Sequence, residues 1–410
     1  MTYLKTRMAS ILFAFGIFFA YSCSSINQST SRESDLTGEA KDQLDILEAA
    51  NATLIEDPGN ADALLFKINA LYSISSQLDQ PIQRLPYYQE MKLTSEQIRA
   101  SHSKDSDLNI KSDSLLVSVW NREQGEGVRL LSQYENLNDE THNEVVNNFE
   151  NAILVNPDSS VTYNLLATTH YQKGDLQAAI QTLEQGYDHL SELPLRFREK
   201  LAFLYLEAGQ IDISIQLYEN LAAEFPGNEQ INHGLINAYI LGERHSYAVQ
   251  LLRDQIARRP YDLIYHESLA TELFFLIRSE IDLLINGDIV ESEVESKIDQ
   301  LTVELLEAEE HFQEVLANHP DPAEILYVTA SFYKNTAAGL SILAEKTSGE
   351  LEVYLTDEAE KLLRKSLPLW EQVLEYNPEN LQIWNSVMQI YLKLGMTEEA
   401  EEIRTRMNLQ

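Results

Sequence analysis

The chain has 410 residues, of which 44% are hydrophobic and 23% are charged, and it contains a single cysteine. This composition can bury a large core, so it excludes a disordered or collagen-like chain. One cysteine excludes a disulfide framework or a thiolate metal cage within the chain. The formal net charge of −35 repels phosphate backbones, which argues against nucleic acid as a partner.

Residues 1–22 have the pattern of a cleaved export signal. Two basic residues precede an apolar run over residues 9–20, which is too short for a membrane-spanning helix of about 20 residues. The only cysteine, Cys23, follows Ala20 and Ser22, an arrangement that resembles the lipobox of bacterial lipoproteins. The resemblance implies that Cys23 is a lipid-attachment site, and a diacylated cysteine holds a chain stably on a membrane. The alternative is an ordinary signal peptide that happens to contain a cysteine.

Residues 23–42 are mostly small and polar and lack apolar periodicity, so they predict a flexible tether. The resemblance to lipoproteins implies that the tether holds a domain on the periplasmic face of a membrane. Ser24 follows the cysteine, where some of those lipoproteins carry an aspartate that favours the inner membrane. The outer membrane is therefore favoured over the inner one.

From residue 43 onward, apolar residues recur at three- and four-residue spacing, which predicts helices throughout. Prolines that follow helices set a period: Pro226 and Pro260 are 34 residues apart, and Pro157 precedes Pro226 by 69 residues, about twice that distance. The recurring aromatic, small and glycine positions in two successive units are Tyr163, Leu166, Ala167, Tyr171, Gly174 and Ala179, then Leu201, Ala202, Tyr205, Gly209 and Tyr218.

This pattern resembles the tetratricopeptide repeat, a pair of antiparallel helices with a period of 34 residues. Small residues let the paired helices approach each other, glycine ends the first helix, and proline stops the second. The resemblance implies that residues 43–410 form an all-α solenoid of helix pairs. It also implies protein–protein interaction, without indicating a particular partner.

Two late units exceed the period. The distances from Pro260 to Pro320 and from Pro320 to Pro378 are 60 and 58 residues. The additional residues keep a helical pattern, which predicts two extended hairpins side by side, over about 263–319 and 323–377. Pro368 lies inside the second hairpin and is expected to kink or split its returning helix.

The first unit has the largest insertion, over about residues 77–141. Residues 77–86 and 101–113 read as loops because they are rich in proline or in short polar residues, and the segment that follows reads as a helix.

The sequence shows no motif that carries chemistry: it has no glycine-rich phosphate loop, no nucleophile elbow and no paired metal-ligand histidines on one helix. We therefore predict no enzyme activity, no catalytic residue, no cofactor and no metal site. Residues 105–109 offer the first oxygens of a calcium loop, but Ile110 and Leu116 replace its glycine and its last glutamate, so they predict a solvated turn.

Residues 288–314 hold ten acidic residues against a single lysine. Such a run is either the solvated outer face of a long helix or a docking surface for a basic partner.

The inner face of a tetratricopeptide array is lined by residues of the first helix of each pair. The register of prolines and glycines places these candidate groove residues there: Asn164, Thr168, Tyr171, Arg196, Glu199, Phe203, His233 and Asn237. Mixed amide, aromatic and charged side chains in a groove suit a protein or peptide partner. The expected function is a non-enzymatic, lipid-anchored scaffold that binds another envelope protein through this groove and the hairpins. The alternative is an envelope protein that binds a small ligand or glycan.

Overall fold

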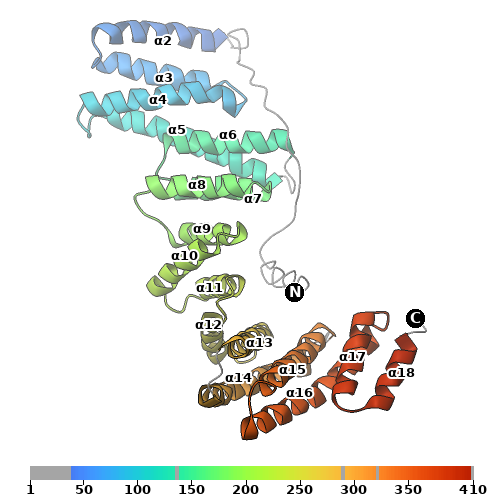
Figure 1. Ribbon diagram of the computed structural model, residues 1–410. Helices are drawn as coiled ribbons and strands as arrows, with labels where there is room; N and C mark the ends of the chain where they lie inside the picture. Colours follow the sequence, from blue (N-terminus) through green and yellow to red (C-terminus); the bar gives the residue numbers. More distant parts are fainter. Residues whose placement is uncertain (1–37, 134–137, 288–290, 320–322, 408–410) are drawn as a thin grey trace. The chain divides into compact units, whose positions relative to one another are not determined.

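The computed structural model describes residues 38–133, 138–287, 291–319 and 323–407, and every element in these ranges is an α-helix (Figure 1). The all-α fold class is thus confirmed. The chain divides into two compact units, an N-terminal unit that ends at Ile231 and a C-terminal unit that begins at Asn232. No helix within the described ranges is both long enough and apolar enough to cross a membrane. The expected signal peptide and Cys23 lie outside the described residues.

The N-terminal unit is a succession of helices in which each packs against the next along the chain. They are α2 (Gly38–Glu56), α3 (Ala61–Ser76), α4 (Pro81–Ser101), α5 (Asp107–Gln133), α6 (Asp139–Val155), α7 (Ser160–Gln172), α8 (Leu176–His189), α9 (Leu195–Glu207) and α10 (Ile211–Glu224). Helix α2 begins at Gly38, inside the range assigned to the tether, whose residues 23–37 are not described.

Two expected loops are helical in their second part, whereas residues 77–80 and 102–106 are loops as predicted. Residues 77–86 and 101–113 read as loops, yet α4 begins at Pro81 and α5 at Asp107. Proline is favoured in the first turn of a helix because the N–H groups of that turn have no acceptor within the helix, so the missing N–H of proline costs no hydrogen bond. Pro86 inside α4 removes one helix hydrogen bond. Burial of Tyr88 and Met91 against the neighbouring helices stabilises α4 by more than this loss.

The pairs α7–α8 and α9–α10 have the residue pattern that the sequence predicts for tetratricopeptide units. In the turn between α7 and α8, Gly174 has a φ of 84°, which a residue with a side chain rarely adopts. Ala167 on α7 and Ala179 on α8 are fully buried where these helices pack. Small side chains at these positions let the paired helices approach, as the sequence pattern requires.

The C-terminal unit takes in most of α11, which starts at the end of the preceding unit. Its helices are α11 (Glu229–Leu241), α12 (His245–Arg258), α13 (Leu263–Asn286), α14 (Glu291–Asn318), α15 (Ala323–Ala344), α16 (Gly349–Tyr376), α17 (Leu381–Lys393) and α18 (Thr397–Met407). The long helices α13 and α14 cover the range of the first expected hairpin, and α15 and α16 cover that of the second.

The two long hairpins pack on each other through α13 and α15. A Cβ added to Gly339 on α15 would lie 2.8 Å from Cγ2 of Ile281 on α13, so only glycine allows this approach. Of the kink or split expected at Pro368, the split does not occur, because α16 is one continuous helix through this residue. Pro368 is exposed while Leu363 and Trp370 on either side of it are buried, so packing of the buried face holds the helix together.

Candidate functional site

Six of the expected groove residues lie on two helices of the N-terminal unit. Asn164, Thr168 and Tyr171 are on α7, and Arg196, Glu199 and Phe203 are on α9. Spacings of three and four residues place each trio on one face of its helix. Arg196 is exposed and the other five are half-buried, so this α7–α9 face presents polar and aromatic groups at the surface.

A lysine that the sequence interpretation left out joins the two helices. Lys200 of α9 donates hydrogen bonds from Nζ to the carbonyl oxygen of Asn164, at 3.2 Å, and to Oγ1 of Thr168, at 2.5 Å. Burial lowers the pKa of the Lys200 amine. The sequence places Lys200 next to Glu199 on the same helix, but only the packing of α9 on α7 shows that it reaches Thr168.

An aromatic pair forms another part of the α7–α9 face. The rings of Tyr171 and Phe203 meet edge to face, with centroids 5.8 Å apart. Burial raises the pKa of Tyr171, and the Tyr171 hydroxyl donates a hydrogen bond to Glu207, whose own pKa is also raised by burial. Glu207 is a second residue of this face that the sequence interpretation missed.

Glu199 supplies a further carboxyl group beside the aromatic pair. Burial raises its pKa, whereas the neighbouring Arg196 and a hydrogen bond from Gln230 lower it. The face therefore contains the Lys200 amine, the carboxyl groups of half-buried Glu199 and exposed Glu207, and two rings that meet edge to face. Such a surface can bind a peptide through hydrogen bonds and aromatic contacts.

The remaining expected groove residues, His233 and Asn237, lie on α11 in the C-terminal unit. Both are half-buried, and the His233 ring meets that of Tyr265 edge to face at 6.3 Å. The structure thus brings six of the eight predicted residues onto one face and assigns these two to the other unit.

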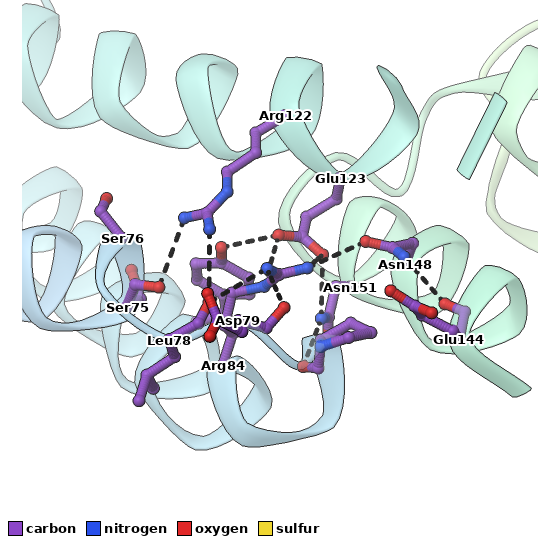
Figure 2. A network of polar contacts seen from close by, with 12 residues as sticks. Ser75, Ser76, Leu78, Asp79, Arg84, Arg122, Glu123, Glu144, Asn148 and Asn151 are labelled. Atoms are coloured by element: carbon purple, nitrogen blue, oxygen red, sulfur yellow. Dashed lines mark hydrogen bonds and ion pairs between the residues drawn. The ribbon is translucent and has the colours of Figure 1, made fainter. Parts of the chain in front are cut away.

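A buried polar network that the sequence did not reveal ties the large insertion to α6 (Figure 2). Nη2 of Arg84 on α4 donates to Glu123 Oε2 on α5, at 3.1 Å, and to Asn148 Oδ1 on α6, at 2.9 Å. Tyr88 donates to Glu123 Oε1 at 2.8 Å, and Asn151 donates to Glu123 Oε2 at 3.2 Å. Because these residues are far apart in the sequence, no local motif marks them.

The network also holds the turn that leads into the insertion. Nη1 of Arg84 donates to the carbonyl oxygens of Leu78 and Asp79, and Arg122 donates to those of Ser75 and Leu78 (Figure 2). The two guanidinium groups thus donate to carbonyl oxygens in the last turn of α3 and in the turn that follows it. We assign this network to the architecture of the insertion.

The structure pairs histidines that the sequence shows as scattered. Nδ1 of His266 lies 2.9 Å from Nδ1 of His311, and His266 Nε2 lies 3.0 Å from the carbonyl oxygen of Pro260. His142 and His170 have ring centroids 5.9 Å apart, and burial lowers the pKa of His142 to about 4. Among the residues described, no group of three or more histidine, cysteine or acidic side chains could hold a metal ion.

Glu272 on α13 and His245 on α12 form a carboxyl–imidazole pair, with Oε2 and Nδ1 2.8 Å apart. Burial raises the pKa of Glu272, and the His245 ring stacks on Phe275. The pair connects two neighbouring helices of the C-terminal unit.

Two hollows bear on the small-ligand alternative. A crevice of about 30 Å³ between the long hairpins is lined by apolar residues such as Ile281, Ile298 and Leu340. That volume is close to the share of one water molecule, whereas ligand sites commonly measure several hundred Å³. An apolar hollow of about 370 Å³ between α2 and α3, beside Ile46 and Phe66, is open to solvent.

Comparisons with known proteins identify repeats at two places. Residues 199–228 match the model of the tetratricopeptide repeat, and residues 382–408 match that of the PPR repeat. No curated protein matches the sequence. The predicted resemblance to tetratricopeptide-repeat proteins is confirmed by these matches and by the observed helix pairs.

Solved structures with similar folds share little sequence with this chain. PilF of Pseudomonas aeruginosa is 9% identical, with 68% of this chain and 99% of that chain covered and a TM-score of 0.38. A tetratricopeptide repeat protein from Parabacteroides merdae is 11% identical, with 78% and 99% covered and a TM-score of 0.32. A MamA RS-1 double mutant is 14% identical, with 48% and 93% covered and a TM-score of 0.36. Similarity at this level carries no information about function.

Proposed function

We propose that this protein is a non-enzymatic scaffold that binds a protein partner across the α7–α9 face. The observation that carries the proposal is the combination of Tyr171, Phe203 and Lys200 on one face of a tetratricopeptide unit. The two rings offer apolar contact at a small entropic cost, and the polar groups around them set the register of a bound segment. The match of residues 199–228 to the tetratricopeptide repeat supports a protein-interaction role.

The proposal extends to where the scaffold is held. The signal-like residues 1–22 and the lipobox-like Cys23 support a lipid-anchored protein on the periplasmic face of a membrane, with the outer membrane favoured. Its partner is then another envelope protein. Nucleic acid is disfavoured as a partner because the net charge is −35, and the PPR-matching residues 382–408 include several acidic side chains on α18.

The small-ligand or glycan alternative has less support. The crevice between the long hairpins has the volume of a single water molecule, and the larger hollow between α2 and α3 is open to solvent.

A site-specific photocrosslinking experiment tests the scaffold proposal. A photoreactive residue at Arg196, which is exposed on the α7–α9 face, is compared in native cells with one at Gln181, which is exposed on α8. We expect a defined envelope protein to crosslink at Arg196 and not at Gln181. The purified partner should then bind the Arg196→Glu variant at least about tenfold more weakly than wild type, with Gln181→Glu unchanged. Equal crosslinking at both positions, or equal binding by both variants, would overturn the proposal.

The anchor is tested separately by fractionating cells that express the Cys23→Ser variant. We expect the variant to leave the membrane fraction, while the wild-type protein stays in it. Membrane association that survives the substitution would contradict lipid anchoring at Cys23.

A further inference from the structure

The outward face of α14 carries a regular pattern of acidic and apolar side chains. We call it the outer stripe and define it by six exposed residues: Glu295, Asp299, Val303, Leu306, Glu310 and Glu314. Their spacings of three and four residues place them in one line along the helix. Two acidic residues thus stand on each side of two aliphatic residues.

The two aliphatic side chains at the centre are exposed to solvent. Val303 is 67% exposed and Leu306 is 57% exposed, whereas Leu301 and Ala308 on the opposite side of α14 are buried. The side chains of Val303 and Leu306 are therefore not part of the hydrophobic core of the hairpin. Half-buried Leu305 on α14 and the partly exposed Tyr354 on α16 line the crevice between the hairpins and add apolar surface close by.

The acidic residues of the outer stripe lack the cations that neutralise their neighbours. On the two flanks of α14, Glu307 pairs with Arg253 of α12 and Glu309 pairs with Lys365 of α16. Over the described part of the chain, no ion pair involves Glu295, Asp299 or Glu310. Arg253 and Lys365 thus pair with acidic residues on the flanks of α14, and the carboxylates of the outer stripe face solvent.

We propose that the outer stripe is a docking surface for a basic amphipathic helix of a partner protein. The matching helix has two aliphatic residues one turn apart, with two Lys or Arg residues on each side of them. Its aliphatic residues would cover Val303 and Leu306, and its basic residues would face the four carboxylates.

The charge pattern selects this occupant over two others. A second copy of the same face would bring acidic residues against acidic residues in either orientation, which is repulsive. A membrane with anionic lipids would repel the face for the same reason. This surface lies in the C-terminal unit and is independent of the α7–α9 face, so either proposal can fail without the other.

The test uses the full chain and a designed probe. The probe is a fluorescent 20-residue helical peptide with two Leu residues one turn apart and two Lys residues on each side, and its counterpart has Glu in place of each Lys. Fluorescence anisotropy measures the Kd of both peptides. We expect the Lys peptide to bind and to weaken with added salt, and the Glu peptide not to bind.

Two variants of the outer stripe separate its charge from its apolar centre. The first carries Glu295→Gln, Asp299→Asn, Glu310→Gln and Glu314→Gln, and the second carries Val303→Ser and Leu306→Ser. All six side chains are exposed, so both variants should keep the circular dichroism spectrum and melting temperature of the wild type. Each should raise the Kd of the Lys peptide by at least about tenfold, since four exposed ion pairs or two buried aliphatic contacts are lost.

A matched control removes the same charge elsewhere. It carries Asp42→Asn, Asp45→Asn, Glu48→Gln and Glu56→Gln, four exposed acidic residues of α2 in the N-terminal unit. We expect this variant to bind the Lys peptide like the wild type. If it weakens binding as much as the change on α14, the attraction is only that of a chain with net charge −35, and the proposal is wrong. It is equally wrong if the Val303→Ser, Leu306→Ser variant binds like the wild type, or if the wild type does not prefer the Lys peptide.

Discussion

Arg84 and Glu123 form an ion pair that is almost entirely shielded from solvent. Arg84 Nε lies 2.9 Å from Glu123 Oε1, and the two side chains are 4% and 0% exposed. Burial and the negative charge of Glu123 both raise the pKa of Tyr88, whose hydroxyl donates to the same carboxylate. The pair therefore links α4 to α5 at the centre of the insertion, where each charge depends on the other.

Removing one charge of this pair should cost far more stability than removing a surface charge. The Glu123→Gln variant leaves Arg84 buried without a counter-charge, so we expect the free energy of unfolding to fall by about 3–5 kcal/mol. The control is Glu401→Gln, which breaks the exposed pair with Arg404 on α18 and should change stability by less than about 0.5 kcal/mol. Urea denaturation followed by circular dichroism measures both. Similar losses in the two variants would contradict the assigned role of the network.

Two glycines two residues apart on α5 should respond in opposite ways to alanine. A Cβ at Gly127 would lie 2.6 Å from Cε1 of Phe149 on α6, while a Cβ at Gly125 would meet no atom within 4 Å. We expect Gly127→Ala to destabilise the protein by about 1–3 kcal/mol through overpacking. Gly125→Ala should stabilise it by about 0.5–1 kcal/mol, because alanine favours the helix. Thermal unfolding of both variants checks the prediction, and the same sign for both would refute it.

The protein should lose stability in mildly acidic solution because of His142. Burial and the neighbouring His170 and Lys173 lower its pKa from 6.5 to about 4, while Asp139 and Asp175 act in the opposite direction. Since the folded pKa lies below the unfolded one, the unfolded chain binds the proton more readily. Above pH 6.5, His142 is neutral in both the folded and the unfolded chain and does not reduce stability. As the pH falls from 6.5 towards 4, the free energy of unfolding should decrease by about 1–3 kcal/mol.

Unfolding free energies of wild type and the His142→Gln variant, measured from pH 7 to pH 4, test this prediction. The difference between the two should shrink or reverse as the pH falls. His189→Gln, at an exposed histidine at the end of α8, serves as the control and should leave the wild-type pH dependence unchanged. A pH dependence that is identical in the wild type and His142→Gln would show that His142 is not the group responsible.

Replacing the proline inside α16 should stabilise the C-terminal unit. Pro368 is exposed and has no N–H to donate to the carbonyl oxygen of Arg364, so Pro368→Ala restores one helix hydrogen bond and should add about 1–3 kcal/mol. Pro226 lies outside any helix, so Pro226→Ala should instead be neutral or slightly destabilising, because alanine raises the conformational entropy of the unfolded chain. Differential scanning calorimetry compares the two. A lower melting temperature for Pro368→Ala would mean that its ring contributes packing that outweighs the lost hydrogen bond.

Local sequence patterns were enough to predict the helical class and the repeat. Each depends on local rules: apolar spacing, small residues at helix contacts, and the positions of Gly174, Pro226 and Pro260. The same local rules misassigned residues 81–86 and 107–113, because prolines and short polar residues mark both loops and the first turns of helices.

Contacts between side chains that are distant in the sequence could be identified only from the folded structure. Arg84 and Glu123 are 39 residues apart and belong to different helices, so nothing in either segment predicts their pairing. The same holds for Lys200 and Thr168. A buried contact depends on how helices pack, and packing is a property of the whole unit rather than of any one stretch of sequence.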